Sequence, residues 1–330
     1  MVNEEKLIVF GPVPSRRLGQ SLGINNIPPK ICTYSCIYCQ LGRTNNQKVQ
    51  REAFYKPKEI KNAVEKKVKE ARKHRETIDY LTFVPDGEPT LDFNLGNEIK
   101  LLKALNIRIA VITNASLLWK KEVQNDLSNV DCVSLKIDTV NEKSWKKINR
   151  PHRSLKFGKV LSGLSEFSRI FHGELFTETM LIKNINDNTQ ELEKIADFIE
   201  ELIPKKSYIS IPIRPPAEKW AKPAEEFDIN MAYQVLKEKG MDVEFLTGYE
   251  GNAFAFTGNV EEDLLSITSV HPMRKEGVNN FLSKAKADWT VIEKLIKENK
   301  LLEVEYKGNK FYMRKLPGKY HINVGGESKN

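Results

Sequence analysis

The sequence predicts an α/β protein with a mainly parallel sheet and a small C-terminal domain. Short apolar runs alternate with amphipathic helical segments at intervals of about 25–35 residues, which is typical of βαβ units. About six such units fit before residue 214, a number that suits a partial (β/α)6 barrel. A doubly wound open sheet would give the same alternation. In either fold, functional side chains gather at the carboxyl ends of the strands.

The elements of this alternation can be placed in order. The first strand precedes Cys32, and later strands are expected at 79–84, 108–113, 132–137, 175–182 and 208–213. Helices are expected between them at 57–75, 98–105, 119–127, 155–170 and 189–202. In the first helix, Ile60, Val64 and Val68 recur every four residues. Asp187 and Asn188 provide capping residues for the last helix.

The end of the chain has a different pattern. Two helices are expected at 275–286 and 288–299, followed by strands at 301–306 and 310–314. Lys307–Asn309 between these strands is a hairpin signal. Helix, helix and hairpin is the order of a winged-helix module. We therefore divide the chain into a core domain, 1–250, and a winged-helix-like domain, 264–318, with the linker in 248–263.

Composition indicates a globular protein with an ordinary core. Hydrophobic residues make up 40% of the chain, and no apolar run approaches the roughly 18 residues of a membrane span. The first residues, Met-Val-Asn-Glu-Glu-Lys, do not resemble a signal peptide, so we expect a cytoplasmic protein without membrane contact. Three of the four cysteines are clustered, which argues against a disulfide framework. Cys132 lies in an apolar strand pattern and is expected to be a core thiol.

Positive charge is concentrated near the C-terminus. The net charge is +8, and residues 271–319 contain twelve Lys or Arg against six Asp or Glu. The rest of the chain has 40 basic and 38 acidic residues. This distribution favours contact between the C-terminal domain and a nucleic acid, with a lysine-rich solubilising surface as the alternative.

Three cysteines stand within eight residues, at Cys32, Cys36 and Cys39. This Cys-x3-Cys-x2-Cys spacing can give three thiolates to a four-iron cluster and leave one iron open. A zinc finger needs four ligands in two separated pairs, and a ferredoxin supplies a cysteine for every iron. A helix would spread the three thiols along roughly 10 Å, so we expect a loop, and Pro28 and Pro29 disfavour a helix. A zinc site or unrelated thiols is the alternative.

This motif, with Tyr38 before its last cysteine, resembles the signature of the radical S-adenosylmethionine superfamily. Residues 10–23 and 31–43 are similar to a clade of iron–sulfur oxidoreductases called wyosine-synthesis-like, and the similarity continues through 213–216 and 270–273. The resemblance implies a partial (β/α)6 barrel of the radical SAM type. It also implies a [4Fe-4S] cluster, S-adenosyl-L-methionine and an external electron donor.

A carboxylate-rich turn, Asp86-Gly87-Glu88-Pro89, follows the second strand. It resembles the superfamily's glycine-glycine-glutamate motif, which holds the methionine amine of S-adenosylmethionine. Asp86 replaces the first glycine, while Gly87 and Glu88 keep their places. Taken alone, a turn with Asp and Gly is commonplace. Its position at a strand end makes Gly87 and Glu88 candidates for cofactor binding.

Further candidates close the next two strands. Asn114 could face cofactor or substrate, or cap the helix that follows. Ser134, Lys136 and Asp138 alternate, so their side chains share one face of a strand. Buried polar groups are costly unless they have partners. By resemblance this strand contacts the ribose or carboxylate of S-adenosylmethionine, although Lys136 could reach the substrate and a strand-edge explanation stays open.

Arg214 closes the sixth strand, and its planar fork suits a carboxylate or phosphate. Arg16 and Arg17 are candidates for the same task, and a structural salt bridge is the alternative for each. His152 and His271 are expected to be structural. The fifth strand has two alternating sets, and its inward set is undecided: Thr177 and Thr179, or Phe176, Glu178 and Met180.

The resemblance implies reductive cleavage of S-adenosylmethionine to methionine and a 5′-deoxyadenosyl radical that abstracts hydrogen from a substrate. Tricyclic-base-forming relatives carry a second cluster on upstream cysteines. No cysteine precedes Cys32, so we do not expect pyruvate condensation on a tRNA guanosine. The basic C-terminal domain favours RNA, such as tRNA, as substrate. The alternatives are a peptide- or protein-modifying radical enzyme, and a non-enzymatic iron–sulfur redox sensor that binds nucleic acid.

Overall fold

A computed structural model describes residues 8–44, 46–246, 248, 254–270 and 272–315. An eight-stranded sheet has the order β1-β2-β5-β6-β7-β8-β9-β10. Only β1 and β2 pair antiparallel in it, and the other neighbours are parallel. The strands of this sheet are β1 (Val9–Ser15), β2 (Gly19–Ile24), β5 (Tyr80–Phe83), β6 (Arg108–Thr113), β7 (Cys132–Lys136), β8 (Glu174–Met180), β9 (Lys206–Ser210) and β10 (Val243–Leu246).

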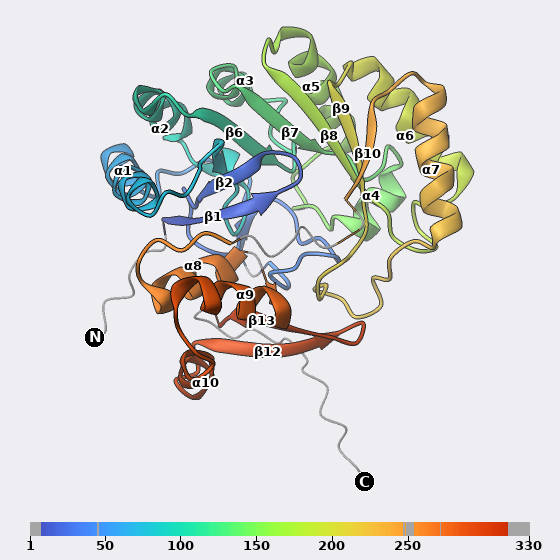
Figure 1. Ribbon diagram of the computed structural model, residues 1–330. Coiled ribbons are helices and arrows are strands. Elements are labelled where there is room, and N and C mark those ends of the chain that lie inside the picture. The colour runs from blue at the N-terminus through green and yellow to red at the C-terminus, as the bar shows by residue number, and fades with distance from the viewer. Residues whose placement is uncertain (1–7, 45, 247, 249–253, 271, 316–330) are drawn as a thin grey trace.

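The sheet curls into an open barrel, and the larger helices lie along its outer side (Figure 1). This arrangement confirms the barrel-like prediction over the doubly wound alternative, which would place helices on both faces. The outer helices are α1 (Pro57–Lys73), α2 (Leu95–Leu102), α3 (Lys121–Leu127), α5 (Phe157–Ile170), α6 (Thr189–Leu202) and α7 (Glu226–Glu238). Shorter elements are β3 (Ile31–Cys32), β4 (Asn46–Gln47), η1 (Pro89–Leu91), η2 (Lys103–Leu105) and α4 (Glu142–Ile148).

Apolar periodicity explains how the outer helices attach to the sheet. Ile60, Val64 and Val68 of α1 are buried, as their spacing predicts. They join the strand residues Leu81 and Val111 in the main core. Each such side chain contributes about 1.5–3 kcal/mol when fully buried. The core therefore fixes the strands, and the strands position their carboxyl ends. Within the described residues, no helix is long and apolar enough to span a membrane.

The C-terminal region packs below β1 in Figure 1. Its three-stranded antiparallel sheet has the order β11-β13-β12. Both predicted helices and the predicted hairpin are present, and Lys307 and Gly308 have the positive φ angles of a two-residue hairpin turn. The winged-helix assignment stays a prediction. The elements are α8 (Val260–Val270), β11 (Met273–Arg274), α9 (Lys275–Ala285), α10 (Thr290–Lys297), β12 (Leu301–Tyr306) and β13 (Asn309–Arg314).

The C-terminal region shares a core with the N-terminal hairpin. Phe10 and Val13 of β1 belong to the same buried cluster as Leu264 and Phe281. The predicted linker includes residues 249–253, which lie outside the described part of the chain. Its next residues pack closely: Phe254 is buried, and the amide of Ala255 donates to Pro12 at 3.1 Å. The described end of this segment is therefore fixed to the barrel and does not extend freely.

Several elements were not predicted from the sequence, among them the β1 strand, α4, the α7–β10 unit and α8, which begins inside the predicted linker. β1 contains Pro12 and Pro14, which normally argue against a strand but are accepted at a sheet edge. In α7 only Ala232 and Leu236 are buried, so the helix has a weak apolar stripe. β10 has four residues, too short for a clear period.

Candidate active site

A cavity of about 310 Å³ lies at the carboxyl ends of the barrel strands. Its wall combines the segment after β2 with the ends of β5, β8, β9 and β10, so residues distant in sequence meet there. Apolar and polar groups are mixed, as in many sites for small ligands. The lining residues are Arg17, Lys30, Cys32, Tyr34, Cys36, Tyr38, Cys39, Gln40, Leu41, Thr44, Pro85, Asp86, Gly87, Glu178, Met180, Ser210, Ile211, Pro212, Ile213, Arg214 and Leu246.

All three clustered cysteines reach this cavity from a non-helical segment, as predicted. Hydrogen-bond donors point at two of the sulfurs. Asn114 Nδ2 and the Tyr34 amide each lie 3.5 Å from Cys32 Sγ. Asn149 Nδ2 lies 3.5 Å from Cys36 Sγ. Such donors stabilise negative charge on sulfur, so the loop is prepared for thiolates.

The thiol environment fits an iron–sulfur cluster. Burial, with a smaller contribution from nearby carboxylates, raises the pKa of Cys36 to about 12 and that of Cys32 further above its ordinary value. The thiols are therefore protonated until metal binds, and binding releases those protons. Among the described residues, no three His, Cys, Asp or Glu side chains are arranged to hold a single metal ion. Three thiols on one cavity wall suit a four-iron cluster, which takes one thiolate per iron.

Gly87 joins the end of β5 to the cysteine loop. A Cβ at this position would lie 1.9 Å from the carbonyl oxygen of Ile31, so only glycine fits. Beside it, Asp86 is buried, and its Oδ1 has no hydrogen-bond partner in the described part of the chain. Burial raises the pKa of Asp86 to about 7, although Lys30 and Arg314 favour its ionised form. The carboxylate of Asp86 can therefore accept a hydrogen bond from a bound ligand.

Glu88 ties the ends of β5 and β6 together. Its carboxylate accepts bonds from the Thr90 amide and hydroxyl, the Thr113 hydroxyl and the Asn114 amide, at 2.6–3.1 Å. Burial raises the pKa of Glu88, and these hydrogen bonds oppose the effect. Protein groups therefore already satisfy the hydrogen-bonding capacity of the Glu88 carboxylate. Asp86 and Gly87, and not Glu88, line the cavity at this point.

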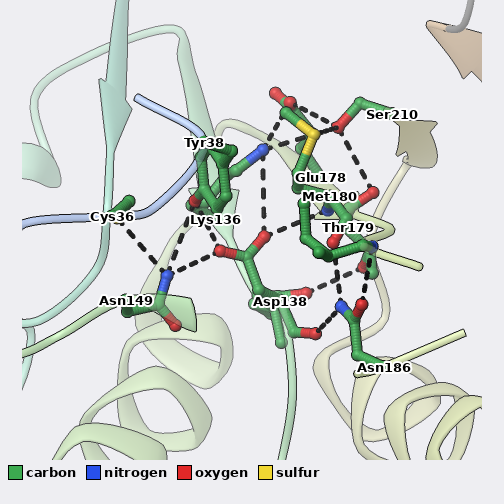
Figure 2. A network of polar contacts seen from close by, with 12 residues as sticks. Cys36, Tyr38, Lys136, Asp138, Asn149, Glu178, Thr179, Met180, Asn186 and Ser210 are labelled. Atoms are coloured by element: carbon green, nitrogen blue, oxygen red, sulfur yellow. Dashed lines mark hydrogen bonds and ion pairs between the residues drawn. The ribbon is translucent and has the colours of Figure 1, made fainter. Parts of the chain in front are cut away.

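Asp138 is the centre of a polar network that connects the cysteine loop to β8 (Figure 2). Tyr38 Oη and Asn149 Nδ2 donate to its Oδ2 at 2.5 and 2.7 Å. The Met180 amide donates to its Oδ1 at 3.0 Å. Because Asn149 also approaches Cys36, the network fixes the loop relative to the strand.

Lys136 continues this network toward Glu178, which lines the cavity. Its Nζ lies 2.6 Å from Glu178 Oε1, 3.8 Å from Asp138 Oδ1 and 5.1 Å from the Tyr38 ring centroid. Arg17 forms a second ion pair with Glu178. Burial would raise the pKa of Glu178, but the two cations outweigh it and hold that pKa well below the ordinary value. Lys136 is therefore engaged in an ion-pair network.

The predicted site residues fall into two groups. Tyr38, Gly87 and Arg214 line the cavity, where Arg214 Nη1 donates to Gln40 Oε1 at 2.8 Å. The others lie behind the wall, and Ser134 Oγ is buried without a hydrogen-bond partner among the described residues. This second group is Glu88, Asn114, Ser134, Lys136 and Asp138.

Other predictions have definite outcomes. The inward set on β8 is that of Glu178 and Met180. Arg17 lines the cavity, whereas Arg16 donates to the Phe245 carbonyl in an exposed contact. Two residues do not line the cavity: Cys132 is a core thiol as predicted, and His152 bonds Ser154. The prediction for His271 falls outside the described residues.

Sequence reasoning missed Lys30 and the pairing of Arg17 with Glu178. Lys30 has a positive φ, and its buried Nζ donates to the carbonyls of Leu41 and Gly42 at 2.5 and 2.6 Å. Lys30 is two residues before Cys32 but belongs to no recognisable sequence motif. The Arg17–Glu178 pair joins residues 161 positions apart, which no local pattern reports.

The site agrees with comparisons to known proteins. Residues 26–199 match the family described as "Radical SAM superfamily". The chain is 48% identical over 311 residues to "UPF0026 protein MJ1312" of Methanocaldococcus jannaschii, covering 94% of this chain and 96% of that protein. The chain therefore belongs to the radical SAM superfamily and to its UPF0026 proteins. Members of the superfamily use a [4Fe-4S] cluster and S-adenosylmethionine, which the three-thiol cavity accommodates.

Two solved structures share the fold. One is a radical SAM methyltransferase from Sphaerobacter thermophilus, with a TM-score of 0.53 and 17% identity, over 69% of this chain and 66% of that chain. The other is TYW1 with a lysine-pyruvate adduct bound, with a TM-score of 0.52 and 15% identity, over 67% and 75%. These likenesses support the open radical SAM barrel.

Proposed function

We propose that this protein is a cytoplasmic radical SAM enzyme that reductively cleaves S-adenosylmethionine to start radical modification of a substrate. The observation that carries the proposal is the set of three thiols, Cys32, Cys36 and Cys39, that line one cavity at the carboxyl ends of the strands. The remaining cysteine, Cys132, is buried in a hydrophobic cluster that contains none of these three cysteines. The chain therefore offers three cysteine ligands to the cavity and not a fourth. One iron then stays open to S-adenosylmethionine.

Cys32, Cys36 and Cys39 would hold the cluster, which would supply the electron for reductive cleavage of S-adenosylmethionine. The chain's own residues hold and orient the reactants. Gly87 lets the backbone approach closely, and Asp86 offers a carboxylate to an ammonium group. Arg214 can bind a carboxylate or phosphate through its planar fork. Apolar wall residues such as Met180 and Ile213 exclude water from the reactive end.

The residues behind the wall support those in front of it. Asp138 holds Tyr38 and the Asn149 amide, and Glu88 holds the amide of Asn114. Ser134 and Lys136 lie on the same strand face as Asp138, which makes them candidates to contact the ribose or carboxylate of S-adenosylmethionine. We therefore retain all of them as cofactor-binding candidates.

We propose RNA as the substrate class because the basic C-terminal region reaches the cavity wall. Tyr306 Oη donates to the Pro212 carbonyl at 3.1 Å, and Pro212 lines the cavity. At the tip of the same hairpin, partial burial and the nearby charge of Lys222 lower the pKa of Lys307. Both lysines are exposed. They can contact a phosphate backbone beside the cavity.

The test is release of 5′-deoxyadenosine by anaerobically reconstituted, reduced protein, with and without small RNA from its host. We expect cleavage that increases with RNA, loss of cleavage in Cys36→Ala, and retention in Cys132→Ala, which removes a thiol from the core. Lys307→Glu should reduce the RNA effect and leave basal cleavage unchanged. No cleavage by protein with a loaded cluster would refute the enzyme proposal. Stimulation by peptides and none by RNA would refute the substrate class.

A further inference from the structure

A second basic region lies far from the C-terminal domain. Residues 142–156 contain six Lys or Arg and a single acidic residue, Glu142. This segment consists of α4 and the loop after it. Asn141 caps the helix by accepting bonds from the amides of Lys143 and Ser144. Trp145 and Ile148 are buried, which turns the lysines of α4 outward.

This segment lies directly against the cysteine loop. Three backbone bonds join the two: Ile37 to Ile148 at 2.9 Å, Ser35 to Asn149 at 3.0 Å, and His152 to Thr33 at 2.9 Å. Ile37 and Ser35 flank Cys36, and Thr33 follows Cys32. The positive surface is therefore attached to the backbone that carries the cluster ligands.

Much of this charge is uncompensated. Lys146 pairs with Glu142 at 2.7 Å, and Arg150 pairs with Glu218 at 2.5 Å. The other four form no ion pair with any residue that the structure describes, and all four are exposed: Lys143, Lys147, Arg153 and Lys156. Trp220 is 47% exposed, and the Arg150 guanidinium lies 5.9 Å from its ring centroid. We call residues 142–156 together with Trp220 the cluster-side basic surface.

The cluster-side basic surface does not form part of the cavity. None of residues 142–156 lines it, and neither does Trp220. A substrate bound on this surface would not be placed over the cavity wall. An electron donor has a different requirement, because it must come close to the cluster and need not enter the cavity. The surface provides that proximity through its contacts with Ile37 and Thr33.

We propose that the cluster-side basic surface docks an acidic one-electron carrier protein. This inference rests on the proposed function, which requires a reduced cluster. One electron passes from the carrier, which is oxidised, to the cluster, which is reduced by one electron, and no atom is transferred. Electron-transfer encounters use small interfaces, and opposite charges raise their association rates. The exposed Trp220, next to Arg150, supplies an apolar contact.

The experiment measures the rate of cluster reduction in reconstituted full-length protein. Reduced flavodoxin, an acidic carrier, is mixed anaerobically with each protein, and the loss of cluster absorbance is followed by stopped flow. The test variant is K143E/K147E, two exposed positions on α4. The matched control is K58E/K69E, two exposed positions on α1, which occupies the opposite flank in Figure 1. Dithionite, a small reductant, replaces flavodoxin in a parallel series.

We expect K143E/K147E to be reduced by flavodoxin about tenfold more slowly than wild type at low ionic strength, with the difference fading at high salt. Dithionite should reduce all three proteins equally, and K58E/K69E should match wild type. Equal flavodoxin rates in all three would overturn the proposal. A defect that dithionite shares would also overturn it, since the variant would then have changed the cluster itself.

The same proteins distinguish an RNA-binding surface from a carrier-binding one. If K143E/K147E lost binding to small RNA but kept the wild-type flavodoxin rate, the surface would belong to a nucleic acid and the proposal would be wrong. Cleavage of S-adenosylmethionine is measured separately. Normal flavodoxin-driven reduction that depends on Lys143 and Lys147, without 5′-deoxyadenosine release, would support the docking surface while refuting the proposed function.

Discussion

Replacing Glu178 by Gln tests the ion-pair network that forms one wall of the cavity. Glu178 pairs with both Lys136 and Arg17, and all three side chains are only 11–16% exposed. The amide keeps the shape of the side chain but loses its charge. Lys136 and Arg17 would then be two partly buried cations beside a neutral group. The substitution should destabilise the protein even when neither cofactor is bound.

The size of the effect follows from this geometry. Removing one partner of a buried ion pair costs about 3–5 kcal/mol. We expect a loss of about 3 kcal/mol in the free energy of unfolding, the lower end of that range. The side chains are still partly exposed to water, and the amide oxygen of Gln can still accept a hydrogen bond from Ser210. Urea unfolding of the apo protein measures it as a shift in midpoint at constant slope. A loss below about 1 kcal/mol would contradict a buried, functioning ion pair.

A double-mutant cycle separates this pair from general packing. Lys136→Met leaves Glu178 paired with Arg17, and the double variant E178Q/K136M should cost less than the sum of the single losses. Acid provides a second check. The folded pKa of Glu178 is below its unfolded value of about 4.3, so its contribution is complete above that pH and is lost as the pH falls. Additive losses, or a wild-type-to-E178Q difference that persists in acid, would refute the ion-pair reasoning.

Three further predictions concern two buried carboxyl groups, Glu98 and Asp86, and Gly87 of the cavity wall. Burial, together with the nearby Asp92, raises the pKa of Glu98, so the folded protein favours the protonated form of this carboxyl. The stability of the wild type, measured by thermal unfolding, should therefore fall from pH 5 to pH 8 relative to that of Glu98→Gln. No relative gain for the Gln variant would contradict this. Gly87→Ala should lower the free energy of unfolding by about 1–3 kcal/mol and reduce the iron content after reconstitution, because the added Cβ would clash with the Ile31 carbonyl. The control is Gly158→Ala, which has no atom near its added Cβ and should not destabilise the protein. Asp86 has a pKa of about 7, so calorimetric affinity for S-adenosylmethionine should rise with pH across neutrality in wild type and stay flat in Asp86→Asn.

The sequence was most informative where the chemistry is local. The spacing of three cysteines within eight residues predicted the loop, and strand periodicity predicted six parallel strands of the barrel. Gly87 could be singled out because the turn that contains it resembles the glycine-glycine-glutamate motif and follows a strand end. These features depend on neighbours along the chain. β10 and α7 were missed because their apolar patterns are too short or too weak to be distinguished from loop.

The rest of the site depends on contacts between distant segments. No pattern around Arg17 could indicate a pair with Glu178, and the raised pKa of Asp86 results from burial under other segments. Charge counting along the chain was also incomplete. It drew attention to the C-terminal region, where several lysines are paired with nearby acids, for example Lys294 with Glu261 and Lys310 with Glu303. The shorter basic segment at 142–156 gained significance only from its contact with the cysteine loop.

The shared core decides how the C-terminal region can be tested. Truncation before Leu264 would expose Phe10 and Val13, and each fully buried apolar side chain contributes about 1.5–3 kcal/mol. It would also cut α8 directly after Asp263, the residue that pairs with the buried ammonium of Lys67 at 2.7 Å. A truncated protein would therefore lose activity through instability whether or not the region binds RNA. Charge reversal at Lys307, on the exposed tip of the hairpin, leaves that core intact, so loss of RNA stimulation in this variant would report on substrate contact.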